Sequence, residues 1–102
     1  MDVRDLRYFV DLRSFIAVYE SESFSLAAES LRTVQSNVST RIKNLEELQG
    51  RPLFERRYRR VLPTDAARRL YPRAKQLMAL LNEALGTVRV LEADTDTRPL
   101  RP

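Results

Sequence analysis

Seven apolar residues recur at alternating intervals of four and three towards the C-terminal end of the chain: Leu70, Ala74, Leu77, Leu81, Ala84, Val88 and Leu91. This spacing puts them on one side of a helix and is typical of the a and d positions of a coiled coil. A helix that carries it is about 40 Å long, which exceeds the width of a domain of this size. The spacing therefore predicts a dimerising helix over residues 64–92, in preference to a stripe that packs only on its own domain.

The rest of the chain is also expected to be helical, because residues that break helices are few. Only two glycines and five prolines occur among 102 residues, and alternating strand patterns are nearly absent. A first helix is predicted from an apolar stripe at helical spacing, made up of Leu12, Phe15, Ile16 and Tyr19. A short alanine-rich helix follows, and Ser25 is its expected N-cap. The predicted fold class is therefore mainly α.

A third helix is predicted after this short one. Its buried stripe consists of Val38, Ile42 and Leu45. Thr33 is expected to cap its start, and Gly50 is expected to end it in a left-handed conformation. The opposite face begins with small, polar, uncharged side chains, which can lie close against another surface. Two helices joined by a tight turn, the second with such a face, are typical of a helix-turn-helix.

A basic stretch then interrupts the helical pattern. Residues 53–56 and 61–63 are expected to form two short extended arms around a loop at residues 57–60, which would make the helix-turn-helix winged. From residue 51 to residue 75 the chain has nine basic residues against two acidic ones, and its formal net charge is +4. Charge alone fits either a polyanionic partner or a solvated charged face.

Two residue types that carry much of enzyme and metal chemistry are missing from the sequence. The chain has no cysteine and no histidine, which excludes disulfides, thiolate metal sites, thiol nucleophiles and the commonest general base. No apolar run is long enough to cross a bilayer, and charged residues stand where a signal peptide would be apolar. We therefore expect an intracellular protein that is not an enzyme and has no membrane partner.

Four features are specific enough to compare with known proteins: SFSLAAESL, TVQSNVSTRIKNLE, PLFERR and the threonine at position 64. With them, residues 11–91 closely resemble the N-terminal DNA-binding domain of LysR-type transcriptional regulators. The resemblance implies a winged helix-turn-helix of three helices and a two-stranded wing over residues 11–63, then the linker helix over residues 64–92. It also implies a C-terminal effector-binding domain of two α/β lobes. That domain is not in this chain, so we expect an excised fragment rather than a natural stand-alone domain.

The resemblance also implies which residues meet DNA. A recognition helix over residues 34–48 enters the major groove, and a wing at residues 56–60 enters the minor groove, led by Arg59. Glutamine and asparagine can bond bidentately to adenine, and serine and threonine can bond to bases or phosphates. The other expected contacts, to bases or to the DNA backbone, are Ser25, Gln35, Ser36, Asn37, Ser39, Thr40, Arg41, Lys43, Arg56 and Arg57.

The chain departs from the family pattern at several of these positions. Many members have proline in place of Ser36 and arginine in place of Thr40, so the base preference of this chain should differ from theirs. Members usually have a small residue and a glycine where this chain has Tyr58 and Arg60. The wing is therefore expected to be bulkier and more basic.

The N-terminal end contains a repeat, DLRYFV at residues 5–10 followed by DLRSFI at residues 11–16. Leu12 and Phe15 of the second copy fit the family's first helix, which leaves residues 1–10 as an N-terminal extension. Either the first helix runs back through part of the first copy, or residues 1–10 are disordered. At the other end, residues 93–102 lack apolar periodicity and are expected to be a disordered tail.

Two classes of function fit these observations. The first is sequence-specific binding of double-stranded DNA by a dimeric regulator in the bacterial cytoplasm, at the nucleoid. The alternative is a coiled-coil dimerisation module whose basic loop binds an acidic protein. The polar face at Ser36, Asn37 and Thr40 favours DNA, because protein-binding helices usually present aromatic or aliphatic anchors. No cofactor is expected in this chain. A small-molecule inducer would bind the C-terminal domain, through which full-length members of the family often form tetramers.

Overall fold

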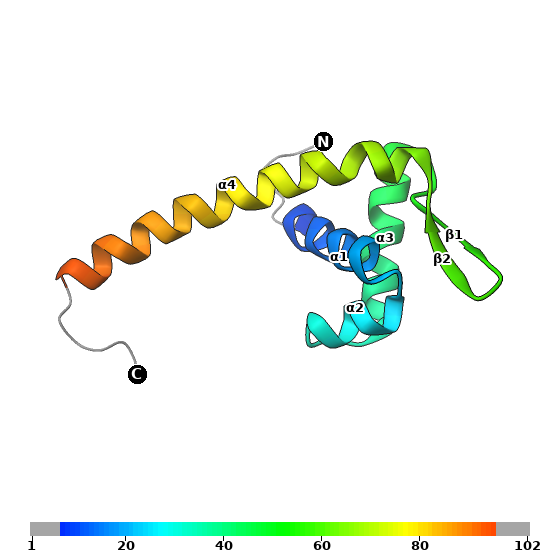
Figure 1. The fold of residues 1–102 in the computed structure, drawn as a ribbon, viewed down its shortest axis with the longest axis horizontal. Helices are drawn as coiled ribbons and strands as arrows, with labels where there is room; N and C mark the ends of the chain where they lie inside the picture. The colour runs from blue at the N-terminus through cyan, green and yellow to red at the C-terminus, as the bar shows by residue number, and fades with distance from the viewer. Residues whose placement is uncertain (1–6, 96–102) are drawn as a thin grey trace.

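The computed structural model describes residues 7–95, with side chains placed for residues 7–86. In chain order the elements are α1 (Arg7–Ser21), α2 (Phe24–Ser30), α3 (Gln35–Gln49), β1 (Phe54–Arg57), β2 (Arg60–Pro63) and α4 (Asp65–Thr95). Figure 1 shows α1, α2 and α3 gathered in a cluster, the β1–β2 ribbon projecting from it, and α4 extending away from it as a long rod. The predicted fold class, a winged helix-turn-helix followed by a long helix, is confirmed.

The hydrophobic core lies where the three short helices meet the wing and the start of α4. Its buried apolar members are Phe15, Val18, Phe24, Ala27, Ala28, Val38, Ile42, Leu45, Leu53, Ala67 and Ala74. The predicted stripe of α3 is confirmed, since Val38, Ile42 and Leu45 are each at most 3% exposed. Gly50 ends α3 with a left-handed φ of 72°, also as predicted.

Phe15 joins α1 to the wing within this core. It is fully buried, and its ring centroid lies 5.9 Å from that of Tyr19 and 5.6 Å from that of Phe54. We expect Phe15→Ala to lower the free energy of unfolding by about 3–5 kcal/mol in urea denaturation, because it leaves a cavity. Leu26→Ala, at a side chain that is 52% exposed, is the control and should cost less than about 1 kcal/mol. Equal losses in the two variants would contradict this role of Phe15.

The two predicted N-caps, Ser25 and Thr33, are wrong. Ser23, not Ser25, caps α2: its hydroxyl accepts a hydrogen bond from an amide N–H of the first turn at 3.0 Å, whereas Ser25 lies inside the helix. The residue that flanks α3 is Val34, which makes no side-chain cap bond, so Thr33 is not the N-cap. Thr64 caps α4, since its hydroxyl accepts a hydrogen bond from the first turn of that helix at 3.3 Å.

The first helix runs back into the first copy of the N-terminal repeat. Because α1 begins at Arg7, the alternative in which this helix is longer than usual is confirmed for residues 7–10, while residues 1–6 lie outside the described part of the chain. Of the four buried side chains of the helix, Asp11, Ser14 and Phe15 belong to the second copy, and Val18 follows it. In the first copy Val10 is 41% exposed, so this copy adds helix length without adding to the core.

The contact between α1 and α4 combines stacking with an ionic group. The rings of Tyr19 and Tyr71 stack at a centroid distance of 4.1 Å, the Tyr71 hydroxyl donates a hydrogen bond to the Glu20 carboxylate, and Lys75 lies 3.2 Å from that carboxylate. The Tyr71 hydrogen bond, helped by Lys75, lowers the pKa of Glu20, and the same hydrogen bond raises the pKa of Tyr71. The contact is therefore strongest near neutral pH, since acid protonates Glu20 and alkali deprotonates Tyr71.

Part of the predicted seam of α4 packs inside the chain's own domain. Ala74 is 2% exposed and Leu70 packs against the same core, because the first turns of α4 lie over α1. The burial of Ala74 corrects the prediction that it pairs two chains, whereas pairing through Leu70 stays a prediction. The helix itself continues to Thr95, past the predicted start of a disordered tail. Val88 and Leu91 lie outside the residues whose side chains are described.

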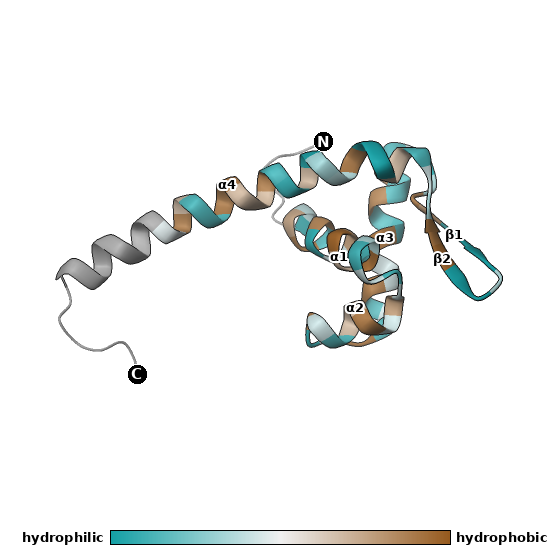
Figure 2. Ribbon diagram, viewed as in Figure 1, coloured by the Kyte–Doolittle hydropathy of each residue, from teal (hydrophilic) through white to brown (hydrophobic). Residues whose placement is uncertain are grey.

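Where α4 leaves the helix cluster it still has hydrophobic residues, seen as brown bands on the ribbon in Figure 2. Leu77, Leu80 and Leu85 are 37%, 63% and 55% exposed, and Ala84 is exposed beside them. Leu81 is half-buried and lines a hollow of about 860 Å³ between α1 and α4. Among the described seam residues after Ala74, Leu77 and Ala84 are therefore exposed and Leu81 is half-buried.

Candidate nucleic-acid interface

The turn between α2 and α3 sets the direction of the candidate recognition helix. Ala27 and Ala28 are buried, so α3 can approach α2 closely. Arg32 takes a left-handed φ of 57°, and the Thr33 amide donates a hydrogen bond to the Ala28 carbonyl at 2.9 Å. These contacts turn the chain sharply and fix the start of α3 at Gln35.

The first two turns of α3 present a small polar surface to solvent. Its exposed side chains are Gln35, Ser36, Asn37 and Thr40. Val38, on the opposite face, is fully buried and holds this surface outward. Lys43 is exposed one turn after the polar surface and adds a positive charge at its end. The predicted outer face, small and uncharged over the first two turns, is confirmed.

Two of these polar side chains are oriented by local hydrogen bonds. The Asn37 amide donates to the Thr33 hydroxyl at 2.8 Å, and the Thr40 hydroxyl donates to the Ser36 carbonyl at 3.0 Å. An amide held through one donor keeps a second donor and a carbonyl acceptor for another molecule. Thr33, which the sequence presented only as a cap, is thus a positioning residue for Asn37.

Ser39 and Lys43 lie on the side of α3 that faces the wing. They border a hollow of about 240 Å³ whose other walls include Phe24 and Arg56. The Arg56 guanidinium lies 4.3 Å from the centre of the Phe24 ring, so this arginine is held by a cation–π contact. The hollow therefore joins the recognition helix to the wing and has cationic side chains from both.

Arg41 and Ser25, also predicted to contact DNA, lie outside the exposed polar surface of α3. Arg41 is half-buried, and its guanidinium donates a hydrogen bond at 3.3 Å to the buried hydroxyl of Ser14 in α1. A contact with DNA would require Arg41 to leave Ser14, so it is the least suited of the predicted residues. Ser25 is exposed in the first turn of α2, and its hydroxyl lies 3.2 Å from that of Ser23. A phosphate contact by Ser25 stays a prediction.

The register of the wing puts its arginines on two faces. The strands pair antiparallel, with Arg56 opposite Val61 and Arg57 opposite Arg60. Since side chains alternate along a strand and paired residues share a face, Arg56 faces the helix cluster while Arg57 and Arg60 face away. Arg57 also lies 3.7 Å from Glu55, an exposed pair of little energetic weight. Arg60 was not among the DNA contacts expected from the sequence. A two-residue loop, in place of the expected loop at residues 57–60, would have paired it with Arg57.

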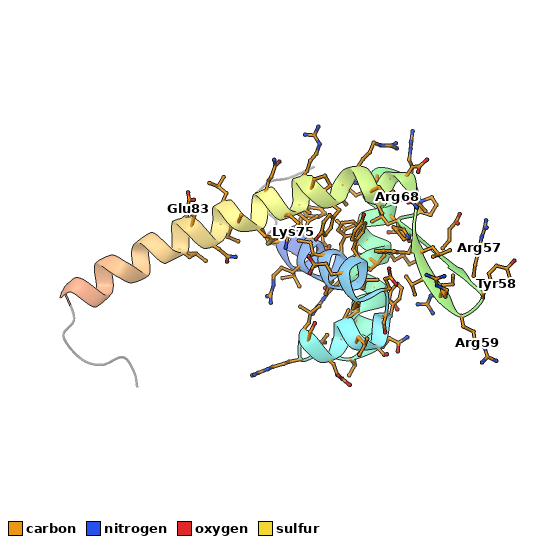
Figure 3. The ribbon with its side chains drawn as sticks, viewed as in Figure 1. Arg57, Tyr58, Arg59, Arg68, Lys75 and Glu83 are labelled. Carbon is orange, nitrogen blue, oxygen red and sulfur yellow. The ribbon has the colours of Figure 1, made fainter. Side chains whose placement is uncertain are left out.

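The tip of the wing consists of two residues in an unusual backbone conformation. Tyr58 and Arg59 have φ angles of 52° and 63°, so both are left-handed without being glycine. Positive φ at both central positions is the mark of a type I′ hairpin turn, which normally selects Asn-Gly or Asp-Gly. Each such residue costs on the order of 1 kcal/mol. Figure 3 shows both side chains projecting from the end of the ribbon.

The basic stretch of the sequence does not form one patch. Arg68 and Lys75 are in ion pairs within the chain, at 2.8 Å and 3.2 Å, and Figure 3 shows both on α4. Arg51, Arg69 and Arg73 line a hollow at the C-terminal end of α3, away from its exposed first turns. The positive charge beside the polar surface therefore comes chiefly from the wing.

The part of the chain that the structure describes offers no cluster of acidic side chains that could hold a metal ion. Within the same range no helix has both the length and the apolar character needed to span a membrane.

Comparison with known protein families identifies the domain. The profile described as "Bacterial regulatory helix-turn-helix protein, lysR family" matches residues 3–68. The HTH-type transcriptional regulator YofA of Bacillus velezensis is 43% identical over 91 residues, which cover 89% of this chain and 31% of the relative. The HTH-type transcriptional regulator BudR of Klebsiella aerogenes is 41% identical over 85 residues, which cover 83% of this chain and 57% of the relative.

Solved structures agree with these relatives. The DNA-binding domain of BenM in complex with benA site 1 DNA is 33% identical with a TM-score of 0.75, and the match covers 83% of this chain and 96% of that one. The corresponding complex of CbnR with DNA is 28% identical with a TM-score of 0.74, covering 81% and 95%. The chain therefore belongs to the lysR family of bacterial regulatory helix-turn-helix proteins.

Proposed function

We propose that this chain binds double-stranded DNA in a sequence-specific manner, as a dimer and as part of a transcriptional regulator. The observation that carries the proposal is the small, uncharged, exposed surface on the first two turns of α3, with a basic ribbon beside it. The two similar structures with DNA-binding domains bound to DNA, those of BenM and CbnR, support it.

The polar surface of α3 suits the DNA major groove. Small side chains let the helix backbone come close to base edges, and Gln35 and Asn37 have the amide geometry that pairs with adenine. Both residues are exposed, and Asn37 is already oriented by Thr33. We expect these turns to read bases while Lys43 contacts phosphate.

The wing suits the backbone and minor groove beside that site. Arg59 is exposed at its tip, where an extended cation can enter a narrow A·T-rich groove of enhanced negative potential. Arg56 lies on the face towards α3 and Arg57 on the other, so the two arginines would meet different phosphates.

The uncovered apolar face of α4 supports a dimer. Leu77, Leu80 and Ala84 are exposed on a part of the helix that no other described element covers. Pairing this part with the same part of a second chain would bury those side chains and hold two recognition helices at a fixed spacing. A regulator of this kind would act on the bacterial chromosome in the cytoplasm, and a small-molecule inducer would bind a C-terminal domain beyond this chain.

Selection of bound sites from a pool of random duplexes tests the proposal. We expect a consensus with two related half-sites, because two copies of α3 would read the DNA. Recovery of unrelated sequences would contradict sequence-specific binding. Tight binding to an acidic protein that DNA does not displace would support the alternative module.

The recognition helix and the wing should respond differently to mutation. Asn37→Ala is expected to change which central bases are preferred, at about 1–3 kcal/mol for a lost base contact. Arg59→Ala is expected to erase a preference for A·T-rich flanks and to leave the base preference at the central positions unchanged. The measurement is the affinity of each variant for duplexes with A·T-rich and G·C-rich flanks, with Arg59→Lys as the matched control. An equal loss of affinity from Arg59→Ala on both flank types would mean that Arg59 makes only a generic phosphate contact.

A further inference from the structure

Tyr58, which precedes Arg59 at the tip of the wing, makes no contact within the described part of the chain that offsets the cost of its backbone conformation. Tyr58 is 91% exposed and makes no hydrogen bond, ion pair or ring contact with any other described residue. It nevertheless takes a left-handed φ of 52°, in a turn that asparagine or glycine would form at lower cost. A strained, bulky and unpacked residue on a projecting tip is a functional feature when a bound partner supplies the missing contacts.

The surroundings of Tyr58 define the chemistry of that partner. Arg57, Arg59 and Arg60 flank it on both sides in the sequence, and Figure 3 shows Arg57, Tyr58 and Arg59 spread around the end of the ribbon. The partner must therefore offer negative charge close to an apolar surface. In a DNA groove the phosphates supply the charge, the deoxyribose rings supply the apolar wall, and the base edges supply hydrogen-bond acceptors.

We infer that Tyr58 is a second DNA-contacting residue of the wing, whose ring packs against the deoxyribose wall of the minor groove that Arg59 enters. The inference rests on the proposed function and names a residue that determines specificity at the same site. Both side chains leave the same two-residue turn, so they meet the groove together. A tip that carries a ring as well as a guanidinium needs a wider groove than an arginine alone.

Groove width is the property that Tyr58 reads. A-tracts have a narrow minor groove, which attracts arginine but leaves little room for an aromatic ring. In this chain the two residues therefore have opposite preferences, and Tyr58 weakens the preference for narrow A·T-rich flanks that Arg59 confers.

Tyr58→Asn is the decisive variant, because asparagine suits the left-handed turn and lacks the ring. The probe is the duplex that the unmutated chain selects from a random pool, prepared with A-tract flanks and with mixed-sequence flanks. We expect binding about tenfold weaker on mixed-sequence flanks and a smaller loss on A-tract flanks. The slope of log affinity against log salt should stay unchanged because the phenol is uncharged, whereas Arg59→Ala should lower that slope. The thermal midpoint should stay equal or rise.

Tyr58→Phe separates the ring from the hydroxyl. It should bind within about threefold of the unmutated chain, since the ring makes the contact. The inference is overturned if Tyr58→Asn binds both probes as tightly as the unmutated chain does. It is also overturned if Tyr58→Asn lowers the thermal midpoint and weakens binding equally on both flank types, or if Tyr58→Phe loses as much affinity as Tyr58→Asn. Failure of the unmutated chain to bind any duplex would overturn the proposed function itself.

Discussion

Replacement of Leu77 and Leu81 by aspartate is expected to convert the dimer into monomers and to weaken binding to a two-half-site duplex by about 10²–10⁴-fold. A linked second binding event gains roughly that factor from its high effective concentration, and a monomer loses it. Four carboxylates per dimer would lie in a seam that is otherwise apolar, where unpaired charges are costly. Sedimentation velocity measures the oligomeric state, and titration of labelled duplex measures the affinity.

The position of Leu77 makes this test specific. It is 37% exposed, so its replacement leaves the core of the domain intact. Gln76→Asp with Asn82→Asp adds the same charge to exposed polar positions of α4 outside the seam and is the matched control. Circular dichroism should show equal helix content in both double variants. If the unmutated chain sediments as a monomer at high concentration in the absence of DNA, the seam does not pair two chains.

Much of the fold could be predicted from residue spacing. The stripe at Val38, Ile42 and Leu45 fixes which side of α3 is buried, and that side in turn fixes the polar outer face. The helix that carries the seam was predicted correctly, whereas Ala74 was wrongly expected to pair two chains. Periodicity marks an apolar face without saying what covers it, and the domain itself covers Ala74.

The helix caps were harder to predict, because neighbouring residues compete for the same role. Ser23 and Ser25 are both good N-caps, and the choice between them depends on where Phe24 must lie. Phe24 is 8% exposed as the first residue of α2, which leaves Ser23 to cap the helix. That burial depends on tertiary contacts with the wing, which local sequence does not contain.

The candidate site could be predicted by position but not by orientation. Arg41 follows Thr40 on the recognition helix, yet it reaches back to Ser14 because α1 packs alongside α3. The two faces of the wing depend on strand register, and a loop predicted at residues 57–60 was two residues longer than the one observed between Arg57 and Arg60. The strain at the tip likewise follows from the short loop and could not be predicted from the longer one.

Salt is expected to change DNA affinity more than any single substitution. A dimer that contacts on the order of 6–10 phosphates should lose about 10³–10⁵ in affinity between 50 and 200 mM salt, because each contact releases counterions from the DNA. Fluorescence anisotropy with a labelled duplex at several salt concentrations gives the slope of log affinity against log salt. A flat response would indicate an apolar protein partner in place of DNA.

Two arginine variants show which cations produce that slope. Arg57 is exposed on the wing, so Arg57→Gln should remove one phosphate contact per chain and reduce the slope of a dimer by about 1.8. Arg73 is equally cationic and exposed, but it lines the hollow at the far end of α3. Arg73→Gln should therefore leave the slope unchanged, although both variants lower the net charge by the same amount. Equal reductions in the two variants would mean that overall charge, not the wing, meets the DNA.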